Sequence, residues 1–390
     1  MTKKKPHFTI KNNSQKGGYR YSDILTPKIL QDVCIKTTGH GEFTYEFDNT
    51  SYNKGRLAII EYDGKIIYVS FSETGKISGR NYFFQSFPTA LTKYHSEKNP
   101  KKRICFYFLS SDGNIATDYF MFMYRLMATA NVEFLNPKVI KQKIFPFNSV
   151  EDIIVHKEKI RSRNKSNNST YITRNPERTA EIYAKTYGAN KYESVLLCLA
   201  TSTLENAKLY EISEQNLKEL PEPSLKVIKS LGNIEVIPTD LTMEKQYLAD
   251  NISLRSPKFN LNLLEKLGAK KCVFCGLAIP AAIAGAHIWP VSDIVKRHDL
   301  TIKAKINFAT DGDNGIWLCE NHHEMFDRNL IRISENGELK ILSTLDENHI
   351  KFIKRNTPNT KIDEEIIVGN FVQYLKKRNR LLPEKNYVSL

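Results

Sequence analysis

Two short motifs near the C-terminus constrain this chain more than any other feature of its sequence. They read Cys272-Val-Phe-Cys275 and Cys319-Glu-Asn-His322, so each places two metal-binding side chains three residues apart. Three thiolates and one imidazole make a tetrahedral ligand set that suits Zn²⁺. Free cysteines are the alternative, but two matched pairs favour the metal more than one pair does. The sequence therefore predicts a structural zinc site formed by Cys272, Cys275, Cys319 and His322.

A further histidine, His323, directly follows the second motif. Adjacent side chains on a helix point about 100° apart, so His322 and His323 do not easily serve one metal centre if this stretch is helical. Asp327 follows His323 by four residues and would share its face of such a helix. The spacing therefore indicates that the two histidines have different tasks.

The segments around these motifs predict a simple order of elements. "GAHIWPVSD", which carries His287 and is broken by Pro290, predicts a short apolar strand. "NGIWLC", which begins at Asn314, predicts a second strand, and "ENHHEMFDRNL" predicts a helix. We therefore expect a strand, a loop, a second strand and a helix, with a zinc ligand pair before the first strand and another at the start of the helix.

This arrangement resembles the HNH endonuclease family, the zinc-bound ββα-metal nucleases of the bacterial restriction endonuclease kind, over about residues 268–345. His287, Asn314 and His323 stand at the three positions that give the family its name. The resemblance implies that His287 is the general base, which takes a proton from the attacking water. It also implies that Asn314 fixes the loop carrying His287. His323 and Asp327 would hold a catalytic divalent cation, Mg²⁺ or another, against the scissile phosphate.

One position departs from the family pattern. Many members have Asp or His just before the general base, as a metal ligand, whereas this chain has Ala286. Water and phosphate can complete the shell of a magnesium ion. Alternatively Asp293, Asp311 or Asp313 reaches in from the long loop, and the sequence does not choose between these possibilities. Ala286 also leaves open a degenerate, inactive module.

Charge points to a polyanionic partner. The formal net charge is +14, and the segment 156–178 holds seven Lys and Arg against two Glu. Such a balance favours nucleic acid, here double-stranded DNA, as the partner. Within this segment Arg161, Arg163 and Lys165 are candidate phosphate contacts, although a merely solvated linker explains them equally well.

The sequence gives no support for a membrane or secreted location. No run of 18 apolar residues is present, so no membrane span is expected. The charged N-terminus has no apolar stretch behind it and is not a secretory signal. A cytoplasmic location is therefore expected.

The fold class expected is α+β, with four regions. Residues 1–155 form a mixed α/β region, the candidate DNA-recognition domain, with a hairpin at Asp63-Gly64. Residues 156–178 form a basic linker and residues 179–260 a helical connector. Residues 261–390 form the ββα-metal (HNH) nuclease domain with its structural zinc, a hairpin at Asn336-Gly337 and a C-terminal amphipathic helix.

These features together predict a site-specific DNA endonuclease of the type II restriction kind. One ββα site cuts one strand, so cleavage of both strands suggests a homodimer. A cognate DNA methyltransferase is the expected genetic partner. The alternatives are a modification-dependent DNA endonuclease and a non-catalytic, zinc-stabilised DNA-binding protein.

Overall fold

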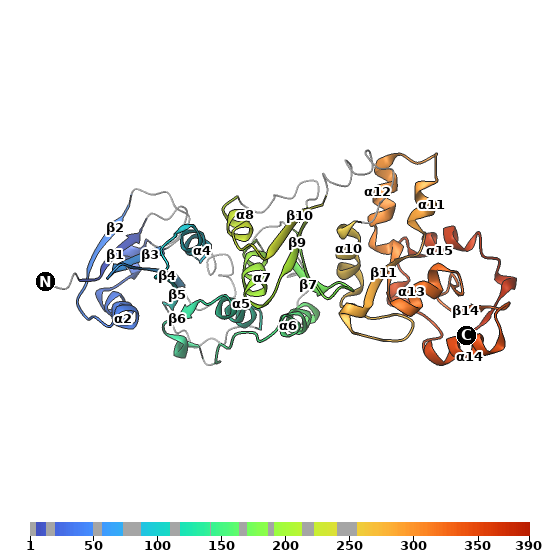
Figure 1. The fold of residues 1–390 in the computed structure, drawn as a ribbon, viewed down its shortest axis with the longest axis horizontal. Coiled ribbons are helices and arrows are strands. Elements are labelled where there is room, and N and C mark those ends of the chain that lie inside the picture. The colour runs from blue at the N-terminus through green and yellow to red at the C-terminus, as the bar shows by residue number, and fades with distance from the viewer. Residues whose placement is uncertain are drawn as a thin grey trace. The chain divides into compact units, whose positions relative to one another are not determined.

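The protein is described here by a computed structural model, shown as a ribbon in Figure 1. The chain divides into two compact units: 1–167, 186–207 and 218–236 form the first, and 168–185, 208–217 and 237–390 form the second. Helices and strands are both present, as the α+β class requires. The described residues are 5–12, 20–49, 57–72, 87–109, 118–140, 142–163, 170–185, 191–212, 222–239 and 256–390.

A six-stranded sheet forms the centre of the first unit. Its order is β2-β1-β3-β4-β5-β6, with β1 parallel to β2 and β4 parallel to β5. The two-residue turn at Asp63 and Gly64 joins β3 to β4, so the hairpin predicted there is confirmed. The strands are β1 His7–Lys11, β2 Thr44–Asp48, β3 Leu57–Tyr62, β4 Lys65–Ser72, β5 Lys102–Phe108 and β6 Glu133–Phe134.

Helices of the first unit use ordinary start and stop signals. The helix α2 begins after the cap Thr26, whose hydroxyl accepts from the Ile29 amide, and ends at Gly39 in the left-handed region. The helices are α1 Tyr21–Ile24, α2 Pro27–Thr38, α4 Phe87–Ser96, α5 Asp118–Thr129, η2 Pro137–Val139, α6 Val150–Arg163, α7 Lys191–Leu204 and α8 Glu222–Lys229.

The expected basic linker is wrong in its described parts. The helix α6 continues to Arg163 and therefore includes Arg161, while Lys165 lies outside the described residues. Lys157, expected in an exposed linker, is 2% exposed and forms an ion pair with Glu193. A buried ammonium needs such a partner, so this part of the segment belongs to a packed core.

The expected helical connector is also corrected. A second sheet has the order β10-β9-β8-β7, made of β7 Thr170–Arg174, β8 Ala180–Lys185, β9 Ala207–Ile212 and β10 Ile234–Pro238. The segment "AEIYAK" was expected to be helical, yet it forms β8. Residues 180–184 are all buried, so the alternation that marks a half-exposed strand is missing.

The second unit contains the predicted order of strand, loop, strand and helix. The strand β11 Ile283–His287 pairs antiparallel with β12 Gly315–Cys319, and α13 Glu320–Asp327 follows. The loop between the strands holds α11 Val291–Val295 and α12 Ile302–Thr310, which pack side by side (Figure 1). Before β11 lie α10 Pro257–Leu267 and η5 Pro280–Ala282, and η6 Gly312–Asn314 precedes β12.

The C-terminal segment completes this unit. The hairpin predicted at Asn336-Gly337 joins β13 Ile331–Ile333 to β14 Leu339–Leu342. The amphipathic helix, predicted over residues 363–382, begins only at Phe371, because Gly369 adopts a left-handed φ of 61°. The remaining elements are α14 Glu347–Asn356, η7 Glu364–Ile366, α15 Phe371–Asn379, η8 Glu384–Asn386 and β15 Tyr387–Ser389.

Two glycines let α10 press against the β11–β12 hairpin. A Cβ at Gly285 would lie 2.7 Å from the Leu263 Cδ1 atom, and one at Gly315 would lie 2.5 Å from the Phe259 Cζ atom. Such distances are too short for carbon atoms in contact, so any larger residue would push α10 away from the strands. No helix within the described ranges is long and apolar enough to cross a membrane.

Candidate active site

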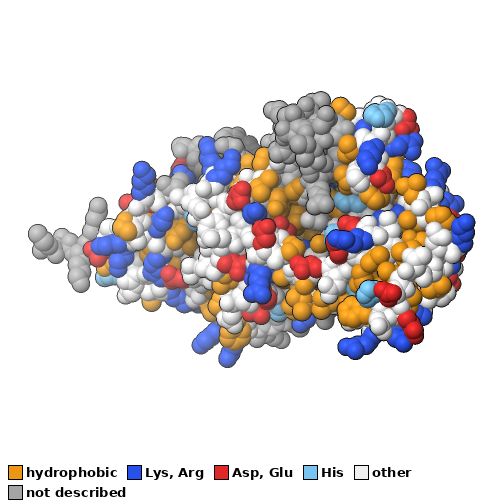
Figure 2. Space-filling model, turned by 45° about the vertical axis from the view of Figure 1, so that its right-hand side comes forward, with side chains coloured by type: hydrophobic (Ala, Val, Ile, Leu, Met, Phe, Trp, Pro, Cys, Tyr) orange, Lys and Arg blue, Asp and Glu red, His pale blue; other side chains and the backbone are white. Residues whose placement is uncertain are grey.

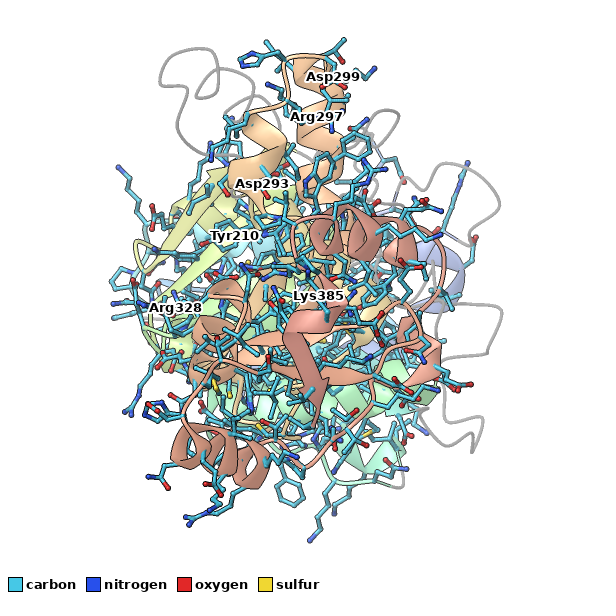
Figure 3. The ribbon with its side chains drawn as sticks, turned by 90° about the vertical axis from the view of Figure 1, so that its right-hand side faces the viewer. Tyr210, Asp293, Arg297, Asp299, Arg328 and Lys385 are labelled. Atoms are coloured by element: carbon cyan, nitrogen blue, oxygen red, sulfur yellow. The ribbon has the colours of Figure 1, made fainter. Side chains whose placement is uncertain are left out.

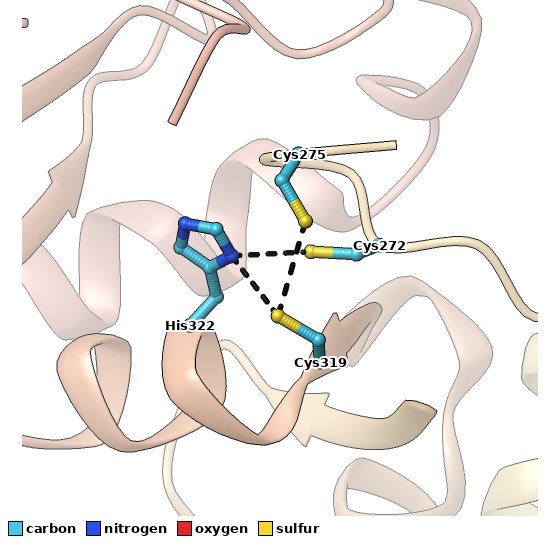
Figure 4. Close-up of side chains that lie close together, drawn as sticks. All are labelled: Cys272, Cys275, Cys319 and His322. Carbon is cyan, nitrogen blue, oxygen red and sulfur yellow. Dashed lines mark hydrogen bonds between the residues drawn. The ribbon is translucent and has the colours of Figure 1, made fainter. Parts of the chain in front are cut away.

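The two cysteine motifs meet at one cluster (Figure 4). Cys272 and Cys275 come from the turn after α10, Cys319 ends β12, and His322 lies in the first turn of α13. The His322 Nδ1 atom is 3.1 Å from the Cys319 sulfur and 3.5 Å from the Cys272 sulfur. The sulfurs of Cys275 and Cys319 are 3.9 Å apart. All four ligand atoms lie within 4.8 Å of one another, as the spacing predicted.

These distances fit a tetrahedral zinc ion. Zinc bonds of about 2.3 Å to sulfur and about 2.05 Å to nitrogen place two sulfurs about 3.8 Å apart and sulfur and nitrogen about 3.6 Å apart. The His322 ring is further held by its Nε2 atom, 3.0 Å from the Thr357 hydroxyl oxygen. Burial raises the pKa of the Cys272 thiol to about 12, so a thiolate at this place calls for a neighbouring cation. The cluster can therefore hold zinc.

His287 ends β11, where two contacts fix its imidazole ring. The Nε2 atom lies 2.9 Å from the carbonyl oxygen of Ala309. Because a carbonyl only accepts, Nε2 carries a proton, and Nδ1 is the nitrogen that can accept one. The ring of Phe259, from α10, stacks on the imidazole with centroids 3.7 Å apart and planes 12° apart. The ring is thus held in the tautomer that suits a base acting through Nδ1.

Asn314 is fully buried and ties the chain that leaves β11 to the end of α12. Its Oδ1 atom accepts from the Trp289 amide at 2.7 Å. Its Nδ2 atom donates to the carbonyl oxygens of Phe308 at 3.0 Å and Trp289 at 3.2 Å. The amide therefore holds the chain that follows His287.

His323 and Asp327 face a cavity, not the cysteines. They lie one turn apart on α13, with the His323 Nε2 atom 3.4 Å from the Asp327 Oδ2 atom. Both line a cavity of about 940 Å³ that is also lined by His287, and we call it the His287 cavity. The structure thus brings His287, His323 and Asp327 to one space and turns His322 to the cysteine sulfurs.

Of the three aspartates that could supply a further metal ligand, Asp293 is the one placed at this cavity. Asp311 accepts a hydrogen bond of 2.7 Å from the Tyr374 hydroxyl. Asp313 pairs with Lys266 at 2.7 Å and accepts from the Asn370 amide at 2.8 Å. Asp311 and Asp313 therefore have structural roles. Asp293 lies on α11, below Arg297 and Asp299 in Figure 3.

Sequence reasoning missed Arg378, on α15. Its side chain is 4% exposed and lines the His287 cavity. Nη1 donates to the Ile288 carbonyl at 3.1 Å, and Nη2 donates to the Asn329 side chain at 2.7 Å and to the Phe326 carbonyl. Burial lowers the pKa of the guanidinium to about 10, so it stays charged near neutral pH. Arg378 therefore joins the residue after His287 to the residue before Asp327.

Another part of the cavity lining was also missed, because its segment was expected to be a helical connector. Glu181 and Tyr183 of β8, Tyr210 of β9 and Asn260 of α10 all line it. The Glu181 carboxylate is 5% exposed and accepts from the hydroxyls of Tyr183 at 2.7 Å and Tyr210 at 3.1 Å. Lys270 also lines the cavity, and burial lowers its pKa to about 8. Polar side chains of β8, β9 and α10 therefore line the same cavity as the histidines.

The Cys/His cluster joins a β-hairpin to the following helix. One histidine on the strand and one on the helix lie at a common cavity. This arrangement is that of the ββα-metal class of nuclease domains. Residues 272–334 match the family model of the HNH endonucleases, so the C-terminal part of the chain contains an HNH endonuclease domain. Such a domain implies a nuclease with DNA as its substrate. No curated protein matches the chain. The matched segment includes neither α10 nor α15, although Phe259 and Arg378 reach the site from them.

Proposed function

We propose that the protein is a metal-dependent, site-specific DNA endonuclease of the type II restriction kind. It hydrolyses phosphodiester bonds of duplex DNA at the HNH site. The observation that carries this proposal is the meeting of His287, His323 and Asp327 at one cavity inside a segment that matches the HNH endonucleases.

The base in this mechanism is His287. Its Nδ1 atom takes a proton from the water that attacks phosphorus, while Nε2 keeps its hydrogen bond of 2.9 Å to the Ala309 carbonyl. That carbonyl also stabilises the imidazolium that forms. The ring of Phe259 holds the imidazole in place during the proton transfer.

The metal-binding residues have two separate tasks. His323 and Asp327 hold the catalytic divalent cation, Mg²⁺ or another, and Asp293 stands at the same cavity. When bound, that cation supplies charge stabilisation for the phosphoryl transition state and the leaving oxygen. The Cys272, Cys275, Cys319 and His322 cluster holds a structural Zn²⁺ and fixes α13 to the hairpin.

DNA recognition is assigned to residues 1–155, with Arg161, Arg163 and Lys165 as phosphate contacts. The net charge of +14 supports a polyanionic partner. On the face seen in Figure 2, Lys and Arg side chains lie scattered among Asp and Glu. Cleavage of both strands needs two sites, so we infer a homodimer. A cognate methyltransferase would protect the host DNA.

A nicking assay tests this function. Supercoiled plasmid is incubated with the full chain and Mg²⁺, with EDTA and the His287→Ala variant as controls. Metal-dependent nicking by the wild type alone supports the proposal. Binding without nicking favours the non-catalytic DNA-binding protein. Cleavage of methylated but not unmodified DNA favours the modification-dependent enzyme.

A further inference from the structure

The His287 cavity has a second wall that hydrolysis does not use. Glu181 and Tyr183 lie two residues apart on β8, so their side chains project from the same face of the sheet. The Tyr210 hydroxyl reaches this face from β9, because it donates to the Glu181 carboxylate at 3.1 Å. These three residues lie outside the segment that matches the HNH family. We call them the β8–β9 wall.

The aromatic part of the wall is a rigid platform. The rings of Tyr183 and Tyr210 are stacked, with centroids 5.0 Å apart and planes 19° apart. Tyr183 is 1% exposed, whereas Tyr210 is only partly buried and lines the cavity. Figure 3 labels Tyr210 and Asp293, two of the residues that line it. An aromatic ring held by stacking and by its own hydroxyl suits a planar ligand such as a nucleobase.

The polar part of the wall accepts hydrogen bonds. An ionised carboxylate has about four acceptor positions, and one on each Glu181 oxygen is used by a tyrosine hydroxyl. A buried carboxylate is costly unless its acceptor positions find donors. Glu181 therefore favours a ligand that brings N–H groups. Asn260 supports this arrangement, since its Nδ2 atom donates to the Tyr183 hydroxyl at 3.3 Å.

This wall is close to the proposed chemistry. Asn260 directly follows Phe259, whose ring stacks on the His287 imidazole at 3.7 Å. Residues of β11 line the same cavity as the β8–β9 wall and His287. A volume of about 940 Å³ is in the range of small-ligand sites, which suits a nucleotide but not a duplex.

We propose that the β8–β9 wall binds the base of a nucleotide next to the scissile phosphate. This inference rests on the proposed endonuclease function. The nucleotide leaves the base stack, its base lies against Tyr210, and an exocyclic amino group donates to Glu181. Enzymes that do chemistry on a base read the flipped base through such stacking and edge contacts. Adenine, cytosine and guanine carry that amino group, whereas thymine offers only its ring N3–H, so the site disfavours thymine.

The first test maps cleavage. A duplex library with randomised sequence is cut by the full chain, and the ends are sequenced. We expect thymine to be depleted about tenfold or more at one position beside the cut, the discrimination of one base contact. Glu181→Gln replaces an acceptor oxygen by an amide that donates to the thymine O4 atom, so thymine should return at that position. Glu211→Gln is the matched control, because Glu211 is buried on the opposite face of β9.

The second test does not depend on cleavage. Binding of dAMP, dCMP, dGMP and dTMP to the full-length His287→Ala variant is measured by ligand-observed NMR. We expect dTMP to bind about tenfold or more weakly than the other three. Tyr210→Phe keeps the ring and should retain binding, whereas Tyr210→Leu should lose it. Thermal melting of each variant separates lost binding from lost folding.

The outcomes separate the two proposals. If the wild type cuts DNA, thymine is as frequent as other bases beside the cut and Glu181→Gln leaves the profile unchanged, the base site is wrong and the endonuclease stands. If the wild type cuts no DNA, the endonuclease is wrong, and the nucleotide measurements decide the base site alone. Equal binding of dTMP and the other nucleotides, or unchanged binding by Tyr210→Leu, overturns it.

Discussion

His322 and His323 are neighbours in the sequence, yet they face different centres. The His322 Nδ1 atom lies 3.1 Å from the Cys319 sulfur, while His323 lines the His287 cavity one turn before Asp327. The turn of about 100° between successive helical residues makes this division possible. One short helix therefore serves a structural cluster on one side and a candidate catalytic centre on the other.

Substitution of the two histidines should have opposite effects. His322→Ala removes a ligand from the cluster, so bound zinc and thermal stability should fall together, because structural zinc contributes to folding. His323→Ala should keep zinc and melting temperature but lose Mg²⁺-dependent nicking. Elemental analysis, thermal melting and nicking rates check all three properties. Loss of zinc in His323→Ala with retention in His322→Ala would mean that the roles are exchanged.

His287→Ala should slow cleavage by about 10²–10⁴, the usual contribution of a general base, and leave DNA affinity nearly unchanged. The reason is its placement: the Ala309 carbonyl and the Phe259 ring orient the imidazole at the cavity. Single-turnover nicking and a binding titration measure the two effects separately. A variant that cuts at the wild-type rate excludes His287 from the mechanism.

Arg378 should act as a positioning residue. Arg378→Gln removes charged donors to the Ile288 and Phe326 carbonyls, and hydrogen bonds from charged groups are each worth about 1.5–3 kcal/mol. We expect a lower melting temperature and a lower kcat, with KM changed less. Arg380→Gln is the control, because Arg380 is exposed two residues later. A normal kcat in a folded Arg378→Gln variant would leave it only a structural role.

Gly285→Ala should loosen α10 from the hairpin. The new Cβ would lie 2.7 Å from the Leu263 side chain, and overpacking of this kind costs about 1–3 kcal/mol. Denaturant unfolding measures the loss. Leu263→Ala leaves a cavity of its own, but in that background Gly285→Ala should cost less than in the wild type, because the clashing atom is removed. Gly41→Ala, whose nearest contact would be at 4.0 Å, should be tolerated. An equal cost of Gly285→Ala in the wild-type and Leu263→Ala backgrounds would contradict this explanation.

A fragment of residues 261–390 should fold less stably than the same part of the full chain. It would begin inside α10 and lack Phe259, and it would lack Tyr171, Tyr183 and Ile212, which belong to the same hydrophobic core. A longer fragment from residue 168 retains them. Circular dichroism melting compares the two fragments. Equal melting temperatures would show that the earlier segments add nothing to this core.

Local spacing determined much of the site from the sequence. The two Cys/His motifs, the pair His323 and Asp327, and the strand, loop, strand and helix around them all depend on residues a few positions apart. Two hairpins were predicted for the same reason, since a turn dipeptide sets the pairing of its own strands. The cluster of Cys272, Cys275, Cys319 and His322 matches the prediction residue by residue.

Tertiary structure decided what surrounds these residues. The strand β8 was expected to be part of a helix between Pro176 and Gly188, and burial of residues 180–184 removes the alternation that would have marked it as a strand. Phe259 and Arg378 approach the site from helices outside the family match, and Glu181 comes from a strand about 100 residues before His287. No local pattern encodes such contacts, because they depend on which faces of distant elements bury each other. The sequence by itself determined which side chains form the zinc cluster and the candidate catalytic site. Packing decided which residues orient those side chains and which residues of β8 and β9 line the same cavity.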